Sequence, residues 1–149
     1  MKKAQAGLDF LMTYGWALLL IVLVVGALFA LGIFDIGNFL GNRVAGFSNI
    51  GVNAWRVADD GVLTVKFSNK AGTDINITNI NATYNTDTLN YSTPVQINNG
   101  KESGTITVGT FPSPGSKGSS YTVTMAISYT DKKTGFQYGD SGTITGKIE

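Results

Sequence analysis

The chain has 149 residues, which gives room for one compact domain and an appendage. Eleven basic residues nearly balance ten acidic ones, for a formal net charge of +1, and the basic residues never run longer than a pair. This composition excludes a nucleic-acid-binding protein, which needs clustered lysine and arginine against phosphates. The absence of cysteine and histidine excludes disulfides and thiolate metal sites, and it removes the commonest general base.

The first predicted element is a long apolar helix. Residues 10–34 contain no charged side chain over 25 positions. At ~1.5 Å per residue, a helix of this length crosses the ~30 Å hydrocarbon core of a bilayer. It exceeds the apolar region of a cleaved secretory signal, which has ~7–15 residues. Lys2 and Lys3 would hold the N-terminus on the cytoplasmic side, with the rest of the chain outside.

Residues 33–47 are predicted to continue this helix in amphipathic form. Their apolar residues fall mostly at spacings of three and four, with polar residues on the other side. Three glycines in this region weaken a helix, so a linker is the alternative interpretation. The expected organisation is therefore a helical segment at residues 5–47 and a β-rich domain at residues 51–149.

After Gly51 the hydrophobic period becomes two. Apolar and polar residues alternate through residues 62–69 and again through residues 121–130. Such alternation predicts strands that are buried on one face. Further strands are predicted at residues 52–57, 75–84, 95–98, 104–108, 136–139 and 142–148. Seven or eight short strands indicate an antiparallel β-sandwich, immunoglobulin-like in general form, so the predicted fold class is α+β.

Turn residues separate these strands, and none of them forms a clear catalytic pattern. Asp59 and Asp60 could contribute to a metal site, but their position before Gly61 between two alternating runs favours a hairpin turn. Residues 112–120 form either a recognition loop or a plain connection. The sequence contains no nucleophile–base pairing, phosphate loop or dinucleotide fingerprint. We therefore expect no enzymatic activity, metal or cofactor.

Three acceptor patterns for N-glycosylation begin at Asn76, Asn81 and Asn90. One or two such matches are expected by chance in a chain rich in asparagine, serine and threonine. Three close together suggest a sugar-bearing face, which agrees with a domain outside the cell.

Asp9 places a carboxylate at the start of the apolar run, where lipid penalises it. One interpretation is a polar residue at the edge of a membrane span. The other begins with cleavage between Ala4 and Gln5, which would give Gln5 a free α-amine one turn from Asp9. The amine and the carboxylate could pair with the corresponding groups of a neighbouring helix, because an unpaired charge in an apolar bundle is far more costly. Asp9 would then set the register between docked helices.

The run KKAQAGLDFLMTYGWALLLIVLVVGALFA (residues 2–30) resembles the class III signal peptide of archaeal type IV pilins, a family that includes archaellins and adhesion pilins. After the cleavage site, that family commonly has glutamine at position one, a small residue at position three and an acidic residue, often glutamate, at position five. These positions correspond to Gln5, Gly7 and Asp9 here. Aspartate for glutamate and glycine for the frequent serine are departures from the family pattern.

The resemblance implies that a prepilin peptidase removes residues 1–4 on the cytoplasmic side and that the helix is retained. It also implies a membrane pilus-assembly platform and its ATPase as partners, and an extracellular filament as the final location. Copies packed with helical symmetry would cover the apolar helix, with small residues allowing close approach. The residues expected to pack in this filament core are Asp9, Phe10, Tyr14, Gly15, Trp16, Ala17, Gly26, Ala27 and Ala30.

The sequence thus predicts a pilin, the structural subunit of an archaeal type IV pilus, with adhesion as its use. One alternative is an uncleaved, membrane-anchored surface domain that binds a glycan or another ligand. Another is a minor pilin-like subunit that starts or caps a filament.

Overall fold

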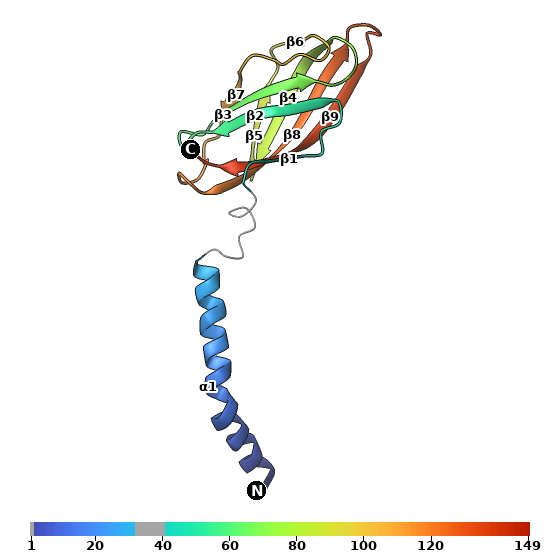
Figure 1. The fold of residues 1–149 in the computed structure, drawn as a ribbon. Helices are drawn as coiled ribbons and strands as arrows, with labels where there is room; N and C mark the ends of the chain where they lie inside the picture. The colour runs from blue at the N-terminus through green and yellow to red at the C-terminus, as the bar shows by residue number, and fades with distance from the viewer. Residues whose placement is uncertain (1, 32–40) are drawn as a thin grey trace. The chain divides into compact units, whose positions relative to one another are not determined.

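The computed structural model describes residues 2–31 and 41–149, without the side chains of residues 2–6 and 11. This part of the chain forms one helix, α1 (Lys2–Ala30), and nine strands (Figure 1). The chain divides into two compact units, one that contains α1 and one that contains all the strands. We refer to the second unit as the β-domain and describe each unit by itself.

Two antiparallel sheets form the β-domain, and Figure 1 shows the smaller sheet in front of the larger one. The larger sheet has the order β1 (Arg43–Ala45), β9 (Gln137–Lys147), β8 (Ser120–Asp131), β4 (Ile75–Tyr84) and β5 (Asp87–Tyr91), and β6 (Val95–Ile97) also pairs with β4. The smaller sheet has the order β2 (Ile50–Val57), β3 (Val62–Asn69) and β7 (Ile106–Thr110). The predicted class, an apolar N-terminal helix followed by an antiparallel β-sandwich, is confirmed.

The core of the β-domain follows from the alternation in the sequence. On β8, every second residue from Tyr121 to Tyr129 is at most 3% exposed, and the residues between them face outward. The strands of the smaller sheet supply the opposite wall. Among the residues that the structure describes, every member of this core belongs to the β-domain, so this domain buries its apolar side chains without α1. Its largest fully buried side chains are Phe67, Phe111, Ile50, Leu63, Ile75, Ile77, Ile80, Ile97, Met125, Ile127, Ile144 and Ile148.

The two ends of the sandwich are made of different loops. At the entry end, the strand β1 pairs with the last part of β9, and the backbone N–H of Asp59 donates to the carbonyl oxygen of Glu149 (2.8 Å). At the far end, the turn between β8 and β9 meets the turn between β3 and β4, where the N–H of Lys132 donates to the carbonyl oxygen of Asp74 (2.9 Å). The chain therefore enters the β-domain at one end, and the turns between β3 and β4 and between β8 and β9 lie together at the other.

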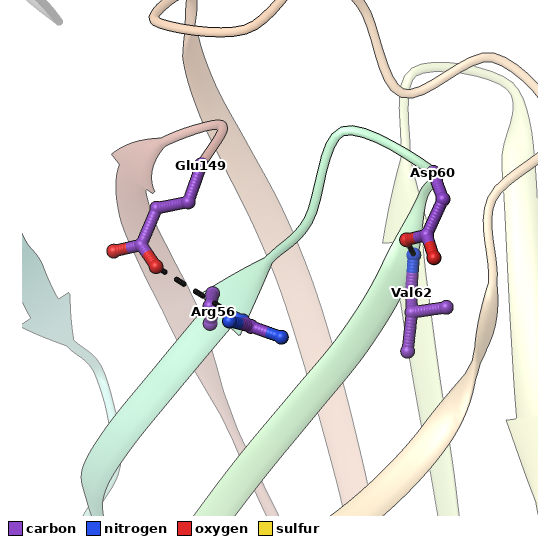
Figure 2. Close-up of polar contacts among 4 residues, drawn as sticks. All are labelled: Arg56, Asp60, Val62 and Glu149. Carbon is purple, nitrogen blue, oxygen red and sulfur yellow. Dashed lines mark hydrogen bonds and ion pairs between the residues drawn. The ribbon is translucent and has the colours of Figure 1, made fainter.

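The hairpin expected at Asp59 and Asp60 is confirmed. Gly61 has a φ of 87°, in the left-handed region that glycine tolerates, and a Cβ there would clash with the carbonyl oxygen of Phe111. The N–H of Val62 donates to Oδ1 of Asp60 (3.1 Å), as Figure 2 shows. The Asp60 carboxylate therefore stabilises the turn between β2 and β3.

The sequence-based strand boundaries agree best where alternation is clear. The strand predicted at residues 75–84 has the same bounds as β4, whereas β7 begins at Ile106 rather than at residue 104. The two strands predicted at residues 136–139 and 142–148 form one continuous strand, β9, so the predicted break is wrong. Asp140 lies inside this strand because its carboxylate turns inward onto backbone donors, as described below.

The helix predicted to continue to residue 47 is wrong in its last part. Residues 32–40 lie outside the described part of the chain, and Arg43–Ala45 form β1 instead, paired with Thr143–Thr145 of β9. Gly46 has a φ of 93°, which ends any helix there, and a Cβ on it would lie 2.9 Å from the Cα of Gly142. Pairing with the edge of β9 thus outweighs the helical periodicity of this segment.

Residues 112–120, which connect β7 to β8, are tied to the C-terminal segment. The N–H of Gly118 donates to the carbonyl oxygen of Ile148 (2.8 Å), and the N–H of Ile148 donates to that of Ser119 (2.9 Å). The segment is a connection held against the entry end of the β-domain.

Candidate functional site

The helix α1 carries a large apolar surface that the chain itself leaves exposed. Among the side chains that the structure describes, Leu28 is partly buried, and the other long apolar side chains of α1 are exposed to fractions from 39% at Val25 to 81% at Met12. They surround the helix rather than follow one stripe, which is typical of a helix buried by lipid or by other proteins. Gly7–Ala30 is a candidate membrane span by length and composition. The apolar surface of α1 is therefore the main candidate site for an interaction.

Asp9 lies on this exposed helix, one turn before Thr13. The hydroxyl of Thr13 donates to the backbone carbonyl oxygen of Asp9 (2.7 Å) and not to its carboxylate. The Asp9 side chain is exposed, and it forms no ion pair with any side chain that the structure describes. Gln5, Asp9 and Thr13 follow one another at spacings of four, so they share one side of the helix. The backbones of Ala4 and Gln5 belong to α1, whereas their side chains lie outside the description.

Three glycines on the surface of α1 have open space beside them in the described part of the chain. A Cβ added at Gly7, Gly15 or Gly26 would meet no atom within 4 Å. Each glycine in a helix interior nevertheless costs about 1 kcal/mol relative to alanine. Nothing in the described part of α1 explains this cost, but a neighbouring helix that packs closely would.

A small hollow accompanies one of these glycines. The rings of Phe10 and Tyr14 lie 4.8 Å apart between centroids. Together with Gly15 and Leu18 they line a cavity of about 100 Å³. Three residues predicted to pack in the filament core, Phe10, Tyr14 and Gly15, are thus brought together. The other predicted packing residues are distributed along the helix, at Trp16, Ala17, Gly26, Ala27 and Ala30.

The three candidate glycosylation sites lie on adjacent strands of the larger sheet. Asn76 and Asn81 belong to β4, and Asn90 belongs to β5. Asn81 and Asn90 are exposed and directly opposite each other in the register, whereas Asn76 is half-buried between the neighbouring strands. Directly opposite residues have Cβ atoms only ~5 Å apart. Glycans on both Asn81 and Asn90 would therefore crowd each other.

Sequence reasoning missed the role of Asp140. This carboxylate is 8% exposed and accepts hydrogen bonds from the backbone N–H groups of Ser48, Asn49 and Ile50, at 2.8–3.1 Å. It thereby joins β9 to the segment that leads from β1 into β2. Its position between two apparent strands concealed this function, because acidic residues at such positions usually mark turns.

Ion pairs contribute little to the stability of the part of the chain that the structure describes. The one ion pair within the described residues joins Nε of Arg56 to Oε2 of Glu149 at 4.0 Å, at the entry end of the β-domain (Figure 2). Both side chains are more than half exposed, so solvent screens the pair. No group of three or more acidic residues that could hold a metal ion occurs among the residues described.

No protein-family model and no curated protein matches this sequence.

Proposed function

We propose that this protein is the structural subunit of an extracellular archaeal type IV pilus, used in attachment to surfaces. The observation that carries the proposal is the contrast between α1, whose apolar side chains are exposed on all sides, and a β-domain that completes its own core. A helix of this kind needs a second environment. The pilin-like pattern of Lys2, Lys3, Gln5 and Asp9 indicates which one.

The mechanism uses two environments for one helix in succession. Before assembly, Gly7–Ala30 lies in the cytoplasmic membrane, where lipid covers its side chains. A prepilin peptidase removes residues 1–4, and the assembly platform with its ATPase extracts the processed subunit. Outside lipid, exposed apolar surface costs ~25 cal/mol per Å², so packing against other copies strongly favours the filament. Helical rather than closed symmetry makes this polymer open-ended.

Asp9 sets the register in this proposal. After cleavage, Gln5 carries a positive α-amine, and Asp9 of a neighbouring copy supplies the matching carboxylate. In an apolar filament core, either charge alone would be strongly unfavourable. The exposed position of Asp9, without an ion-pair partner among the described side chains, leaves its carboxylate available for such a pair. Wrong registers would separate the two charges.

The β-domain forms the outer layer of the filament in this account. The outer faces of β8 and β9 carry threonine and serine between their buried residues, and the neighbouring strands carry the three sequons. The processed chain loses two of its eleven basic side chains, so nine basic side chains remain against ten acidic ones and the side-chain balance becomes −1. A nearly neutral, hydroxyl-rich surface, with or without glycans at Asn76, Asn81 and Asn90, suits a filament exposed to the environment.

A second candidate function remains consistent with the same helix. Since Gly7–Ala30 could span a membrane without being processed, the chain could be a membrane-anchored surface domain whose β-domain binds a ligand. A minor pilin-like subunit would use the same helix at the end of a filament.

The test of the proposed register is a pair of substitutions at Asp9. Asp9→Ala should leave the protein in the membrane fraction but abolish filaments, whereas Asp9→Glu, which keeps the charge, should form them. Intact mass confirms in each case that residues 1–4 have been removed, so that a processing defect is distinguished from an assembly defect. Normal filaments from processed Asp9→Ala protein would contradict the proposed role of Asp9.

A further inference from the structure

Two aromatic side chains are unusually exposed at the far end of the β-domain. Within residues 41–149, Phe136 (68% exposed) and Tyr138 (45% exposed) are the large apolar side chains that solvent reaches most. Phe136 precedes β9, and Tyr138 is the second residue of that strand. The ring of Tyr138 lies against the ring of Tyr129, with centroids 5.8 Å apart and planes 30° apart. Tyr138 is thus held in place while part of its ring remains accessible.

A surface cavity of about 210 Å³ opens beside Tyr138. Its walls come from segments far apart in the sequence, the stretch before β2, the turn between β3 and β4, and the end of β8. Hydrogen bonds from backbone N–H groups to side chains hold two of these segments in place. The N–H of Asn49 donates to Asp140 (2.8 Å), and the N–H of Ala71 donates to Oδ1 of Asn69 (2.9 Å). The lining residues are Asn49, Ala71, Tyr129, Asp131 and Tyr138.

Two polar groups of this cavity, the Asp131 carboxylate and the Tyr129 hydroxyl, have protonation states that suit hydrogen bonding. Desolvation raises the pKa of Asp131, but hydrogen bonds from the backbone N–H groups of Lys133 and Thr134 outweigh it and leave the pKa below its usual value. The carboxylate is therefore an acceptor at neutral pH. Burial raises the pKa of Tyr129, partly offset by a hydrogen bond with the side chain of Asn49. The Tyr129 hydroxyl consequently remains protonated.

A second cavity, of about 380 Å³, is lined by the turn between β3 and β4, the turn between β8 and β9, and Asn99 from the turn after β6. Gly72, Thr73 and Asp74 come from the turn between β3 and β4, and Lys132 and Lys133 come from the turn between β8 and β9. The far end therefore offers a partly aromatic cavity and a polar cavity, both bordered by these turns. This arrangement suits a ligand longer than one small molecule.

The chemistry of the lining selects among possible ligands. An apolar protein side chain would cover the Asn49 amide and the Asp131 carboxylate without giving either a further hydrogen bond, which is unfavourable for polar groups taken out of water. A small anion would meet the Asp131 carboxylate. A sugar ring has an apolar face that can stack on an aromatic ring, and hydroxyl groups that both donate to a carboxylate and pair with an amide.

We propose that the far end of the β-domain binds a neutral pyranose unit of a polysaccharide, stacked on Tyr138 and Phe136 with its hydroxyl groups held by Asn49 and Asp131. The adjacent polar cavity takes the next unit of the chain. The use of this site for attachment by a filament rests on the proposed function, but binding of the sugar does not.

The experiment uses the full chain in micelles of a detergent without a sugar headgroup. The probe is an array of immobilised neutral oligosaccharides of glucose, galactose, mannose and N-acetylglucosamine, followed by titration of the best binder. We expect Tyr138→Ala and Phe136→Ala each to weaken binding about tenfold, the loss of one stacking contact. Tyr138→Phe, which keeps the ring, should bind within about threefold of the unmodified protein.

Thr124→Ala is the matched control, because Thr124 is exposed on β8 and far from the cavity in the strand. It should bind as the unmodified protein does. Thermal unfolding of every variant establishes that the β-domain is folded. Failure to bind any member of the array would overturn the proposal, and so would binding by Tyr138→Ala and Phe136→Ala as tight as that of the unmodified protein.

Filament formation is scored separately in the native cells. Sugar binding by a chain that never forms filaments would support this inference and contradict the proposed function. Filaments that form normally from a chain that binds no sugar would support the proposed function and contradict this inference.

Discussion

The two parts of this chain use similar apolar side chains in opposite ways. In the β-domain, isoleucine, valine and phenylalanine lie between two sheets, many of them with no exposed surface. In α1, leucine, valine and isoleucine point outward on all sides, mostly more than half exposed. The β-domain is thus complete as a single chain, whereas α1 is complete only with lipid or another protein around it. The first thirty residues are therefore the part of the chain that needs lipid or another protein to cover it.

The largest expected effect comes from separating the two parts. We expect residues 41–149 alone to be a soluble, folded monomer, because their core needs no residue of α1. The full chain should remain in solution only with detergent or as filaments. Sedimentation velocity with and without detergent measures both. An unfolded or aggregated 41–149 fragment would show that the β-domain is not self-sufficient.

A pair of truncations to alanine extends the comparison to single residues. Phe67→Ala empties a fully buried position and should destabilise the β-domain by about 3–5 kcal/mol. Leu23→Ala, on the exposed surface of α1, should change that stability by less than about 0.5 kcal/mol. Hydrogen exchange of the β8 amides in the full chain measures the stability of the β-domain in each variant. Similar losses in both would mean that α1 contributes to the same cooperative unit.

Asp140→Ala should destabilise the β-domain by about 2–4 kcal/mol, because it removes a charged acceptor and leaves backbone donors of residues 48–50 without a partner. Asp140→Asn should destabilise the β-domain less, since the amide oxygen of asparagine can still accept hydrogen bonds from these donors. The control is Asp87→Ala on β5, a partly exposed carboxylate, with an expected change below about 0.5 kcal/mol. Chemical denaturation of the full chain, followed by near-UV circular dichroism, gives the three values. If Asp140→Ala and Asp87→Ala lowered the stability of the β-domain equally, the hydrogen bonds of Asp140 would contribute nothing measurable to it.

The smallest effect is a loss of stability at high pH. Burial raises the pKa of Tyr121 to about 12, opposed by a hydrogen bond with the Val57 backbone. Because the folded state has the higher pKa, this contribution is fully present below the ordinary tyrosine pKa of 10.0 and is lost as the pH rises from there towards 12. The loss should reach about 1–3 kcal/mol and should be absent in Tyr121→Phe. Denaturation midpoints between pH 9 and 12 test this, and identical profiles would refute it.

The sequence predicts the helix and the main strands because their signals are local. A 25-residue run without charge specifies a lipid-compatible helix, and strict alternation specifies β3, β4 and β8. The strand β5 was missed because the turn before it uses Asn85 in the left-handed region (φ 53°), without the glycine that usually reveals such a hairpin.

Other features could not be predicted because they depend on contacts between distant segments. The strand β1 exists only through pairing with β9, about a hundred positions later. The backbone N–H groups that donate to Asp140 lie 90–92 residues earlier in the chain. The cavity beside Tyr138 likewise combines residues from four segments. The exposed apolar helix was predictable, since a long run without charge is itself a local signal.

The most direct test of the account is the N-terminus of the protein sheared from the surface of its native cells, determined by intact mass and terminal sequencing. The account predicts a chain that begins at Gln5, in material that sediments as filaments. A chain that begins at Met1 or Lys2, and that leaves the membrane only in detergent, would contradict it. In that case α1 is a permanent anchor, and Asp9 is a polar residue at the edge of its span.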